Sequence, residues 1–239
     1  MLYRLFDLNI MINERYPETE YALREYLSGG SGEADMLIRI TDSEIAEERN
    51  RDRVNSDAYL EMICIFRHIT EEIPDFDGMF VHSAVLDADG NGYMLTGKSG
   101  AGKSTLAIGW LKYMKNVKVI NGDKPILRFF PDGIYAYGSP WCGTQGLNVN
   151  GKVKLSSGGF VVQSERNFAV PLNSNEVFKR LLNQTVIPRS AERRLKHFEL
   201  LDRLIKEIPF CEINCDISQN AVEMSYSAME NIQKNRNKS

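Results

Sequence analysis

The sequence lacks three features that each mark a class of protein. Its 239 residues contain no run of about 18 apolar residues, so neither a membrane span nor a membrane partner is expected. Basic residues are not in excess, because 29 Lys and Arg stand against 32 Asp and Glu. Proteins that bind nucleic acid by neutralising phosphates are usually more basic, so a nucleic-acid partner is not expected either. Internal repeats and low-complexity segments are also absent.

Cysteine is scarce as well. Of the four cysteines, only Cys211 and Cys215 are close in sequence, and no second cysteine or histidine cluster accompanies them. A zinc site is therefore not expected. We expect the cysteines to be reduced thiols in a cytoplasmic protein. The first seven residues carry a charge within their apolar run and no small-residue cleavage site, which is not typical of a signal peptide.

The composition that remains is 43% hydrophobic and 26% charged, as in an ordinary globular protein. Apolar residues at period two predict strands over residues 5–11 and 36–40, with a helix over 20–26 between them. Helical spacing predicts a helix over 56–73, with Ser56 as its N-cap. These elements suggest a small β-rich N-terminal α+β subdomain over residues 1–78.

Residues 79–239 show a different pattern, in which strands and helices alternate. The turn Asp89-Gly90-Asn91-Gly92 joins two predicted strands, 80–86 and 93–96, and a helix over 103–114 follows a glycine-rich segment. Further predicted strands are 117–120, 126–130, 135–137, 153–155, 159–163 and 211–214, and further helices are 175–182, 192–207 and 218–232. We therefore expect an α/β fold with a mixed sheet in this larger part.

Residues 97–104, GKSGAGKS, match the pattern G-x-x-x-x-G-K-[ST] at every position. The glycines let several backbone N–H groups face one anion, and the following helix points its positive end at the same place. A strand before the motif and a helix after it are the context that nucleotide binding needs. The residues expected to bind the nucleotide are Gly97, Ser99, Gly100, Ala101, Gly102, Lys103, Ser104 and Thr105.

Within this motif, Lys103 is expected to reach the β- and γ-phosphates and Ser104 to ligate Mg²⁺. Asp123 follows the next predicted strand, where a carboxylate can meet the metal ion or take a proton from an incoming hydroxyl. The alternative for Asp123 is a turn-capping role. His82, on the strand before the hairpin, is a third candidate, although a lone histidine on an apolar strand is more often a packed core residue.

These segments together resemble the nucleotide-binding core of ATP-dependent phosphoenolpyruvate carboxykinase and of HPr kinase/phosphorylase. In both families, a histidine-bearing strand precedes the P-loop and a strand ending in paired aspartates follows it. The closest resemblance is to bacterial HPr kinase-related proteins with segments such as NDDKP and GTPWCGK. The corresponding residues here are 121–125, NGDKP, and 138–144, GSPWCGT.

The resemblance implies a phosphoenolpyruvate carboxykinase-like P-loop core and phosphoryl transfer from ATP to a hydroxyl. It assigns Asp123 as base or metal ligand and His82 to the vicinity of the phosphates or the metal. Two residues depart from the pattern: Gly122 replaces the first aspartate of the pair, and Thr144 replaces a lysine. Carboxykinase activity itself is not expected, because those enzymes are about twice this length. The chain also departs from HPr kinase itself, since Thr105 replaces the glutamate that normally follows the P-loop of that family.

Two other segments leave alternatives open. Trp141 lies in a loop rich in glycine and proline, where it either forms a wall against a substrate or packs over the loop. Arg189, Arg193 and Arg194 form a basic cluster at the start of a predicted helix. A solvated helix face is the default interpretation of this cluster, and an arginine that reaches the transferred phosphate is the alternative.

The predicted function is an ATP- and Mg²⁺-dependent kinase that acts on a hydroxyl, such as a serine of a peptide or small protein, with a small-molecule acceptor also open. In this prediction Lys103, Asp123 and His82 are the catalytic residues, and Ser104 and Asp123 hold the metal. Gly122 and Thr144 favour the alternative, a nucleotide-binding regulatory or scaffold protein without turnover. An ATPase without an acceptor ranks last, because no water-positioning Glu or Gln is evident. Relatives of HPr kinase are often oligomeric, so a homo-oligomer is also a prediction.

Overall fold

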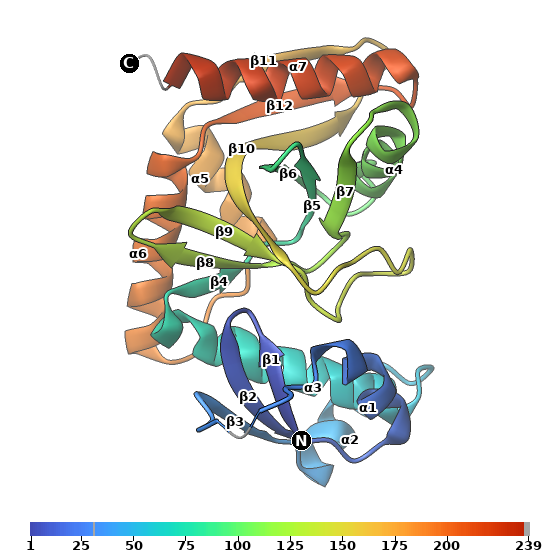
Figure 1. Ribbon diagram of the computed structural model, residues 1–239, viewed down its shortest axis with the longest axis vertical. Coiled ribbons are helices and arrows are strands. Elements are labelled where there is room, and N and C mark those ends of the chain that lie inside the picture. The colour runs from blue at the N-terminus through green and yellow to red at the C-terminus, as the bar shows by residue number, and fades with distance from the viewer. Residues whose placement is uncertain (31, 237–239) are drawn as a thin grey trace.

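The computed structural model describes residues 1–30 and 32–236 and has a mixed α/β architecture (Figure 1). Over these residues, a separate three-stranded sheet belongs to the N-terminal part, and a nine-stranded curled mixed sheet forms the larger part. The two parts lie at opposite ends of the long axis in Figure 1. Within the same residues, no helix combines the length and the apolar character needed to cross a membrane.

The N-terminal part differs from its prediction in two places. The expected strand over 5–11 is a hairpin of β1 and β2, because Phe6 and Asp7 have positive φ angles of 57° and 61° and turn the chain. The helix α2 was not predicted, since its sequence is almost entirely polar, but a capping box between Thr41 and Glu44 starts it. Helix α3 begins after Ser56 as predicted. The elements are β1 (Leu2–Leu5), β2 (Leu8–Asn13), α1 (Pro17–Leu23), η1 (Arg24–Tyr26), β3 (Met36–Arg39), α2 (Asp42–Arg51), α3 (Asp57–Glu72) and η2 (Ile73–Phe76).

The larger part follows the predicted order of strands and helices. Its elements are β4 (Gly78–Phe80), β5 (Ser83–Ala88), β6 (Asn91–Thr96), α4 (Lys103–Tyr113), β7 (Val117–Asn121), β8 (Ile126–Phe130), β9 (Gly133–Tyr137), β10 (Lys152–Gln163), β11 (Phe168–Pro171), α5 (Ser174–Leu181), η3 (Leu182–Gln184), α6 (Ala191–Glu207), β12 (Phe210–Cys215) and α7 (Gln219–Arg236). Most of its strands are buried on both faces, which explains their nearly continuous apolar sequences.

Three predicted strands change in the structure. The strand expected over 80–86 is interrupted at Val81 and His82, so that β4 pairs with β8 while β5 pairs with β6 and β7. The strands expected over 153–155 and 159–163 are one strand, β10, with an irregularity between Leu155 and Ser157. Strand β10 pairs with β9 through its first residues and with β12 through its last, so it joins the two parts of the curled sheet.

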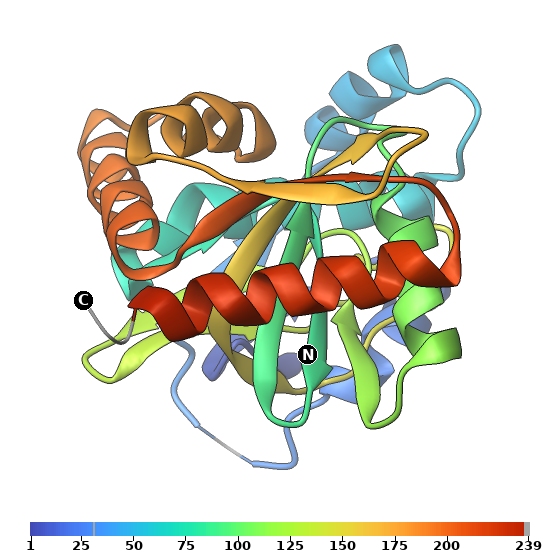
Figure 2. The ribbon, with the colours of Figure 1, turned by 90° about the horizontal axis from the view of Figure 1, so that it is seen from above.

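Helices cover both faces of the sheet around β10 (Figure 2). On one face, α4 and α7 bury Trp110 and Met229 against Val161 and Ile213. On the other face, α5 and α6 bury Leu181 and Leu201 with Phe210. This arrangement holds the end of β6 and the start of α4, and hence the glycine-rich segment between them, against a rigid core.

A third core cluster belongs mainly to the N-terminal part but includes Phe80, Ile126, Tyr137 and Trp141 from the larger part. Helix α3 makes much of this contact, since Phe66 lies against both Phe80 and Trp141. The N-terminal part is thus packed directly beneath the loops that follow β7 and β9. The domain boundary at residue 78 stays a prediction.

Candidate functional site

The glycine-rich segment forms a loop between the end of β6 at Thr96 and the start of α4 at Lys103. Gly97 has a φ of 136°, and a Cβ atom there would lie 3.0 Å from the carbonyl oxygen of Val161 on β10. Gly102 has a φ of 98° directly before the helix. Only glycine adopts such angles readily, so the loop needs these residues to turn from the strand into the helix.

The side chain of Lys103 lies across this loop. Its Nζ donates hydrogen bonds to the carbonyl oxygens of Gly97 at 3.0 Å and Lys98 at 3.2 Å. Burial lowers the pKa of Lys103, and the nearby charge of Asp123 opposes that shift. These two hydrogen bonds hold the ammonium at the loop that leads into α4. The first N–H groups of α4 have no acceptors within the helix, so this end of the helix is also positive. Ser104 and Thr105 are exposed on this first helical turn.

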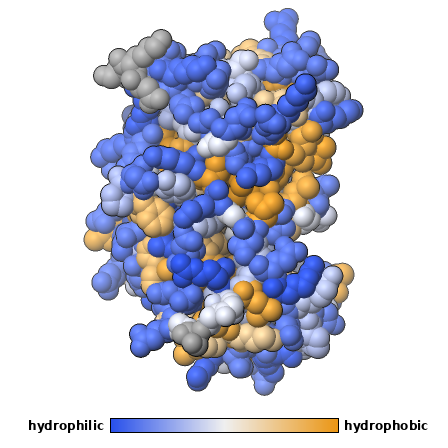
Figure 3. All heavy atoms as spheres, viewed as in Figure 1, coloured by the Kyte–Doolittle hydropathy of each residue, from blue (hydrophilic) through white to orange (hydrophobic). Residues whose placement is uncertain are grey.

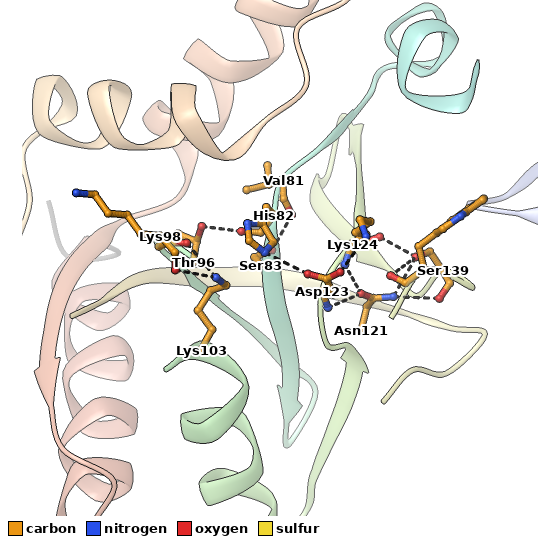
Figure 4. A network of polar contacts seen from close by, with 12 residues as sticks. Val81, His82, Ser83, Thr96, Lys98, Lys103, Asn121, Asp123, Lys124 and Ser139 are labelled. Atoms are coloured by element: carbon orange, nitrogen blue, oxygen red, sulfur yellow. Dashed lines mark hydrogen bonds and ion pairs between the residues drawn. The ribbon is translucent and has the colours of Figure 1, made fainter. Parts of the chain in front are cut away.

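Asp123 is positioned by a turn at the end of β7 (Figure 4). The buried side chain of Asn121 accepts hydrogen bonds from the backbone N–H groups of Asp123 at 2.9 Å and Lys124 at 2.7 Å. Its amide donates to the carbonyl and hydroxyl oxygens of Ser139, each at 3.0 Å. Asn121 thus fixes both the turn and its contact with the loop after β9. Sequence reasoning missed this role, although an asparagine two residues before an aspartate is a typical turn signal.

The carboxylate of Asp123 contacts two cationic or polar side chains. His82 Nε2 lies 3.1 Å from its Oδ1, and Lys124 Nζ lies 3.0 Å from its Oδ2. Burial by itself raises the pKa of Asp123, but the hydrogen bond from His82 and the charge of Lys124 outweigh it and lower the pKa to about 2. Asp123 is therefore a carboxylate at any ordinary pH. Lys124 was not among the predicted site residues.

His82 occupies the break between β4 and β5. Its backbone N–H donates to the carbonyl oxygen of Gln184 at 2.6 Å, and its carbonyl oxygen accepts from the hydroxyl of Thr96 at 2.9 Å. The interruption of the strand turns its half-exposed ring out of the core and toward Asp123. The structure therefore does not place His82 as a packed core residue. The other two histidines lie elsewhere: His68 pairs with Glu44, and His197 is buried.

The donors suit a magnesium ion held mainly by a nucleotide. Within the part of the chain that the structure describes, no group of three or more His, Cys, Asp or Glu side chains converges as a metal site. Mg²⁺ in nucleotide sites typically takes one or two protein oxygens and completes its shell with phosphate oxygens and water. The Ser104 hydroxyl and the Asp123 carboxylate are oxygen donors of that kind, so the predicted pair fits the chemistry of the ion.

Two cavities flank the glycine-rich loop. The first has a volume of about 720 Å³ and is bordered by the leading half of the loop, including Gly97, Ser99, Gly100 and Ala101. The second has a volume of about 530 Å³ and is bordered by Gly102 and Thr105 at the first turn of α4. Further residues of the first cavity are Lys98, Phe160, Val161, Val162, Gln163, Lys179, Arg180, Asn183, Gln184 and Glu212. The sequence offered no signal for Lys179 or Arg180, because they reach the cavity only through the packing of α5.

The two departures from the family pattern lie in different surroundings. A Cβ atom on Gly122 would lie 3.2 Å from the carbonyl oxygen of Cys142 and 3.3 Å from that of Leu147, so the loop after β9 closes over this position. Gly143 of the same loop lies directly against the Asp123 side chain. Thr144 is exposed. A side chain at position 122 would therefore require this loop to shift by a few tenths of an ångström.

The open alternatives for Trp141 and for the arginine cluster are decided by contacts. Trp141 is buried, donates its Nε1 hydrogen to the carbonyl oxygen of Met62 at 2.9 Å and packs against Phe66, so it has a packing role. Arg193 pairs with Asp75 at 2.8 Å on the outer side of α6. Neither it nor Arg189 or Arg194 borders the two cavities beside the loop.

A scan against models of protein families finds no match for this sequence. A search of curated proteins likewise finds no match. Among solved structures, the chain is similar to the HPr(Ser) kinase/phosphatase from Coxiella burnetii, with 12% sequence identity and a TM-score of 0.39 over 66% of this chain and 98% of that chain. A TM-score this low describes a distant, partial similarity in chain path.

Proposed function

We propose that this protein is an ATP- and Mg²⁺-dependent kinase that transfers the γ-phosphoryl group to a hydroxyl, most simply a serine of a peptide or small protein. The proposal includes a phosphoenolpyruvate carboxykinase-like P-loop core over residues 79–239 and a separate subdomain over residues 1–78. One observation carries it. The Lys103 ammonium is held across a glycine-rich loop at a helix N-terminus by the Gly97 and Lys98 carbonyl oxygens, and the charge of nearby Asp123 partly offsets the lowering of its pKa by burial.

In this proposal the loop N–H groups and Lys103 hold the phosphates. Mg²⁺, when bound through Ser104 and Asp123, neutralises the charge that develops on the phosphate oxygens. Lys103 adds a second positive charge at the same oxygens, in a buried setting that strengthens its effect. Thr96 and Gln184, which bond the backbone of His82, keep its ring on the open side of the loop.

The acceptor hydroxyl would approach Asp123. A carboxylate with a pKa of about 2 is a weak base, and an efficient general base has a pKa nearer the working pH. Phosphoryl transfer needs little proton removal before its loose transition state, so Asp123 can accept a hydrogen bond from the hydroxyl and align it. The His82 ring, whose Nε2 lies 3.1 Å from Oδ1 of the same carboxylate, holds that carboxylate in position.

The second candidate is a nucleotide-binding regulatory or scaffold protein without turnover. The close approach at Gly122 favours it, since a side chain there would require the loop after β9 to shift by a few tenths of an ångström. Each carboxylate oxygen of Asp123 also already has one partner, since Oδ1 contacts His82 and Oδ2 contacts Lys124. A hydroxyl acceptor would have to share an oxygen with one of these two contacts.

Calorimetric titration with ATP, ADP and GTP, with and without Mg²⁺, separates the two candidates when it is followed by product analysis. A kinase should bind ATP in a Mg²⁺-dependent manner and form ADP only when a hydroxyl acceptor is added. Binding without turnover for serine peptides, small proteins and small alcohols would favour the regulatory candidate. Absence of nucleotide binding would contradict both.

A further inference from the structure

One end of the sheet face that carries α5 and α6 is left open beside the glycine-rich loop. Phe160 of β10 pairs with Glu212 of β12, which in turn pairs with Val170 of β11. Two residues further along the strands, Val162 of β10 and Phe168 of β11 both pair with Asn214 of β12. Directly paired residues point to the same face of a sheet, so these side chains form one surface.

The apolar part of this surface is open to solvent. Phe168 and Val170 are each 46% exposed and Val162 is 37% exposed, whereas Phe160 beside them is only 3% exposed. The helices α5 and α6 cover the rest of the same face, where Leu181 and Leu201 of these helices pack with Phe210 of β12. The exposed residues therefore extend the core cluster beyond the edge of α5. Other apolar side chains gather on the surface near α4 (Figure 3), but the exposed ones on this helix, Ile108, Leu111 and Tyr113, do not border either cavity beside the loop.

This surface adjoins the leading half of the loop. Gln163 at the end of β10 donates a hydrogen bond to the carbonyl oxygen of Gly100 at 2.8 Å, and Phe160 and Val162 line the same 720 Å³ cavity as Gly97 and Ser99. The first turn of α4 faces the other cavity. A nucleotide whose phosphates follow the loop to this turn would place its nucleoside in the 530 Å³ cavity and would leave the larger cavity for a second substrate.

The rim of the larger cavity carries an excess of positive charge. Arg180 pairs with Glu212 at 2.6 Å and lies 5.5 Å from the Phe160 ring, so its charge is partly compensated. Lys98 and Lys179 are exposed, and no carboxylate pairs with either of them among residues 1–30 and 32–236. The cavity thus combines two uncompensated cations with an apolar floor.

We propose that these residues form an acceptor groove, made of Phe160, Val162, Phe168, Val170, Lys179 and Arg180, that binds a peptide in which an acidic side chain lies near an apolar one. The inference rests on the proposed kinase function and names the substrate class for the same site. The apolar side chain packs on Val162, Phe168 and Val170, and the acidic side chain lies against Lys179. The hydroxyl between them then reaches the phosphate from the side of Gln184 and His82.

The test uses four pools of fluorescein-labelled serine peptides, whose flanking residues are acidic and apolar, acidic and polar, basic and apolar, or basic and polar. Binding is measured by fluorescence anisotropy with the full chain in Mg²⁺ and ADP, and phosphate incorporation is measured with ATP. The variants are Lys179→Glu and Val170→Asp, both at exposed positions outside the loop. Lys115→Glu, an exposed lysine after α4, is the matched control.

The acidic and apolar pool should bind most tightly. Lys179→Glu should weaken its binding by about three- to tenfold and improve the binding of the basic pools, since an exposed charge contact contributes on this scale. Val170→Asp should weaken both apolar pools. ADP binding should stay the same in all variants, and Lys115→Glu should behave as the unchanged protein.

Equal binding of the four pools, absence of binding, or the same effect from Lys179→Glu and Lys115→Glu would each overturn the groove. The proposed kinase function fails separately. If the acidic and apolar pool binds selectively but no pool is phosphorylated, the groove stands as a peptide site and the kinase proposal is contradicted. Phosphorylation without any sequence preference would support the kinase and overturn the groove.

Discussion

The Nε2 atom of His82 lies 3.1 Å from the Oδ1 atom of Asp123, although the two residues flank different strands and the glycine-rich loop lies between them in sequence. The contact forms because β5 pairs with β6 on one side and with β7 on the other. The histidine precedes β5, and the aspartate follows β7, so the antiparallel pairing of β5 and β7 brings both residues to the same end of the sheet. Asp123 is thereby kept ionised near Lys103 of the glycine-rich loop.

Replacement of Lys103 by alanine should weaken ATP binding by about ten- to a hundredfold. The ammonium is the charged group held within the loop, and a hydrogen bond to a charged group is worth about 1.5–3 kcal/mol. Calorimetric titration measures the effect, with Lys112→Ala on the last turn of α4 as the control. Unchanged affinity in Lys103→Ala would show that the loop does not bind phosphate.

Replacement of Asp123 by asparagine should leave ATP binding within a few-fold and reduce phosphoryl transfer by about 10²–10⁴-fold. The amide can still contact His82, but it carries no charge for the metal or the acceptor hydroxyl. Single-turnover measurement of ADP formation with saturating acceptor separates the two effects. Asp132→Asn, which alters an exposed hydrogen bond to Tyr135, should retain full activity. Full activity in Asp123→Asn would remove its catalytic role.

Replacement of Trp141 by alanine should lower the free energy of unfolding by about 3–5 kcal/mol, as for other large buried aromatic side chains. The change leaves a void beside Phe66 and removes the donor to the Met62 carbonyl oxygen. Trp141→Phe keeps most of the volume and should cost less. Urea unfolding of the two variants provides the comparison, and equal stability of Trp141→Ala and the unchanged protein would contradict the packing role.

Stability should fall as the pH falls from about 6.5 to about 4, partly because of His197. Burial lowers the pKa of His197 to about 4 from its ordinary value of 6.5. Its folded-state pKa is below the unfolded value, so in this window the unfolded chain binds the proton that the folded chain excludes. The loss reaches on the order of 3 kcal/mol when the window has been crossed.

The matched variant for this test is His197→Gln, which removes the titrating ring while leaving an amide near the Thr185 hydroxyl. Urea unfolding at several pH values should show a smaller loss for this variant than for the unchanged protein between pH 6.5 and 4. The slope is the readout, because the substitution itself can lower stability at every pH. Parallel slopes would show that His197 does not titrate in this way.

Local patterns in the sequence predicted most of the larger part. The loop from Gly97 to Ser104, the turn at Asp89 and Gly90 and the helix after Lys103 depend on neighbouring residues, so a single chain segment carries their signal. The hairpin at Phe6 and Asp7 escaped prediction because a bulky residue such as Phe6 rarely adopts a positive φ, and apolar residues flank the single turn-forming residue Asp7. Helix α2 escaped because its apolar face is nearly absent.

The sequence alone determined that a glycine-rich loop with the G-x-x-x-x-G-K-[ST] pattern stands between a strand and a helix, since eight consecutive residues carry that pattern. Tertiary structure decided what surrounds it. The pairing of β5 and β7 brings His82 to Asp123, and the packing of α5 on β10 and β12 brings Arg180 to the cavity. These contacts join segments distant in sequence, and no local periodicity encodes which buried faces meet.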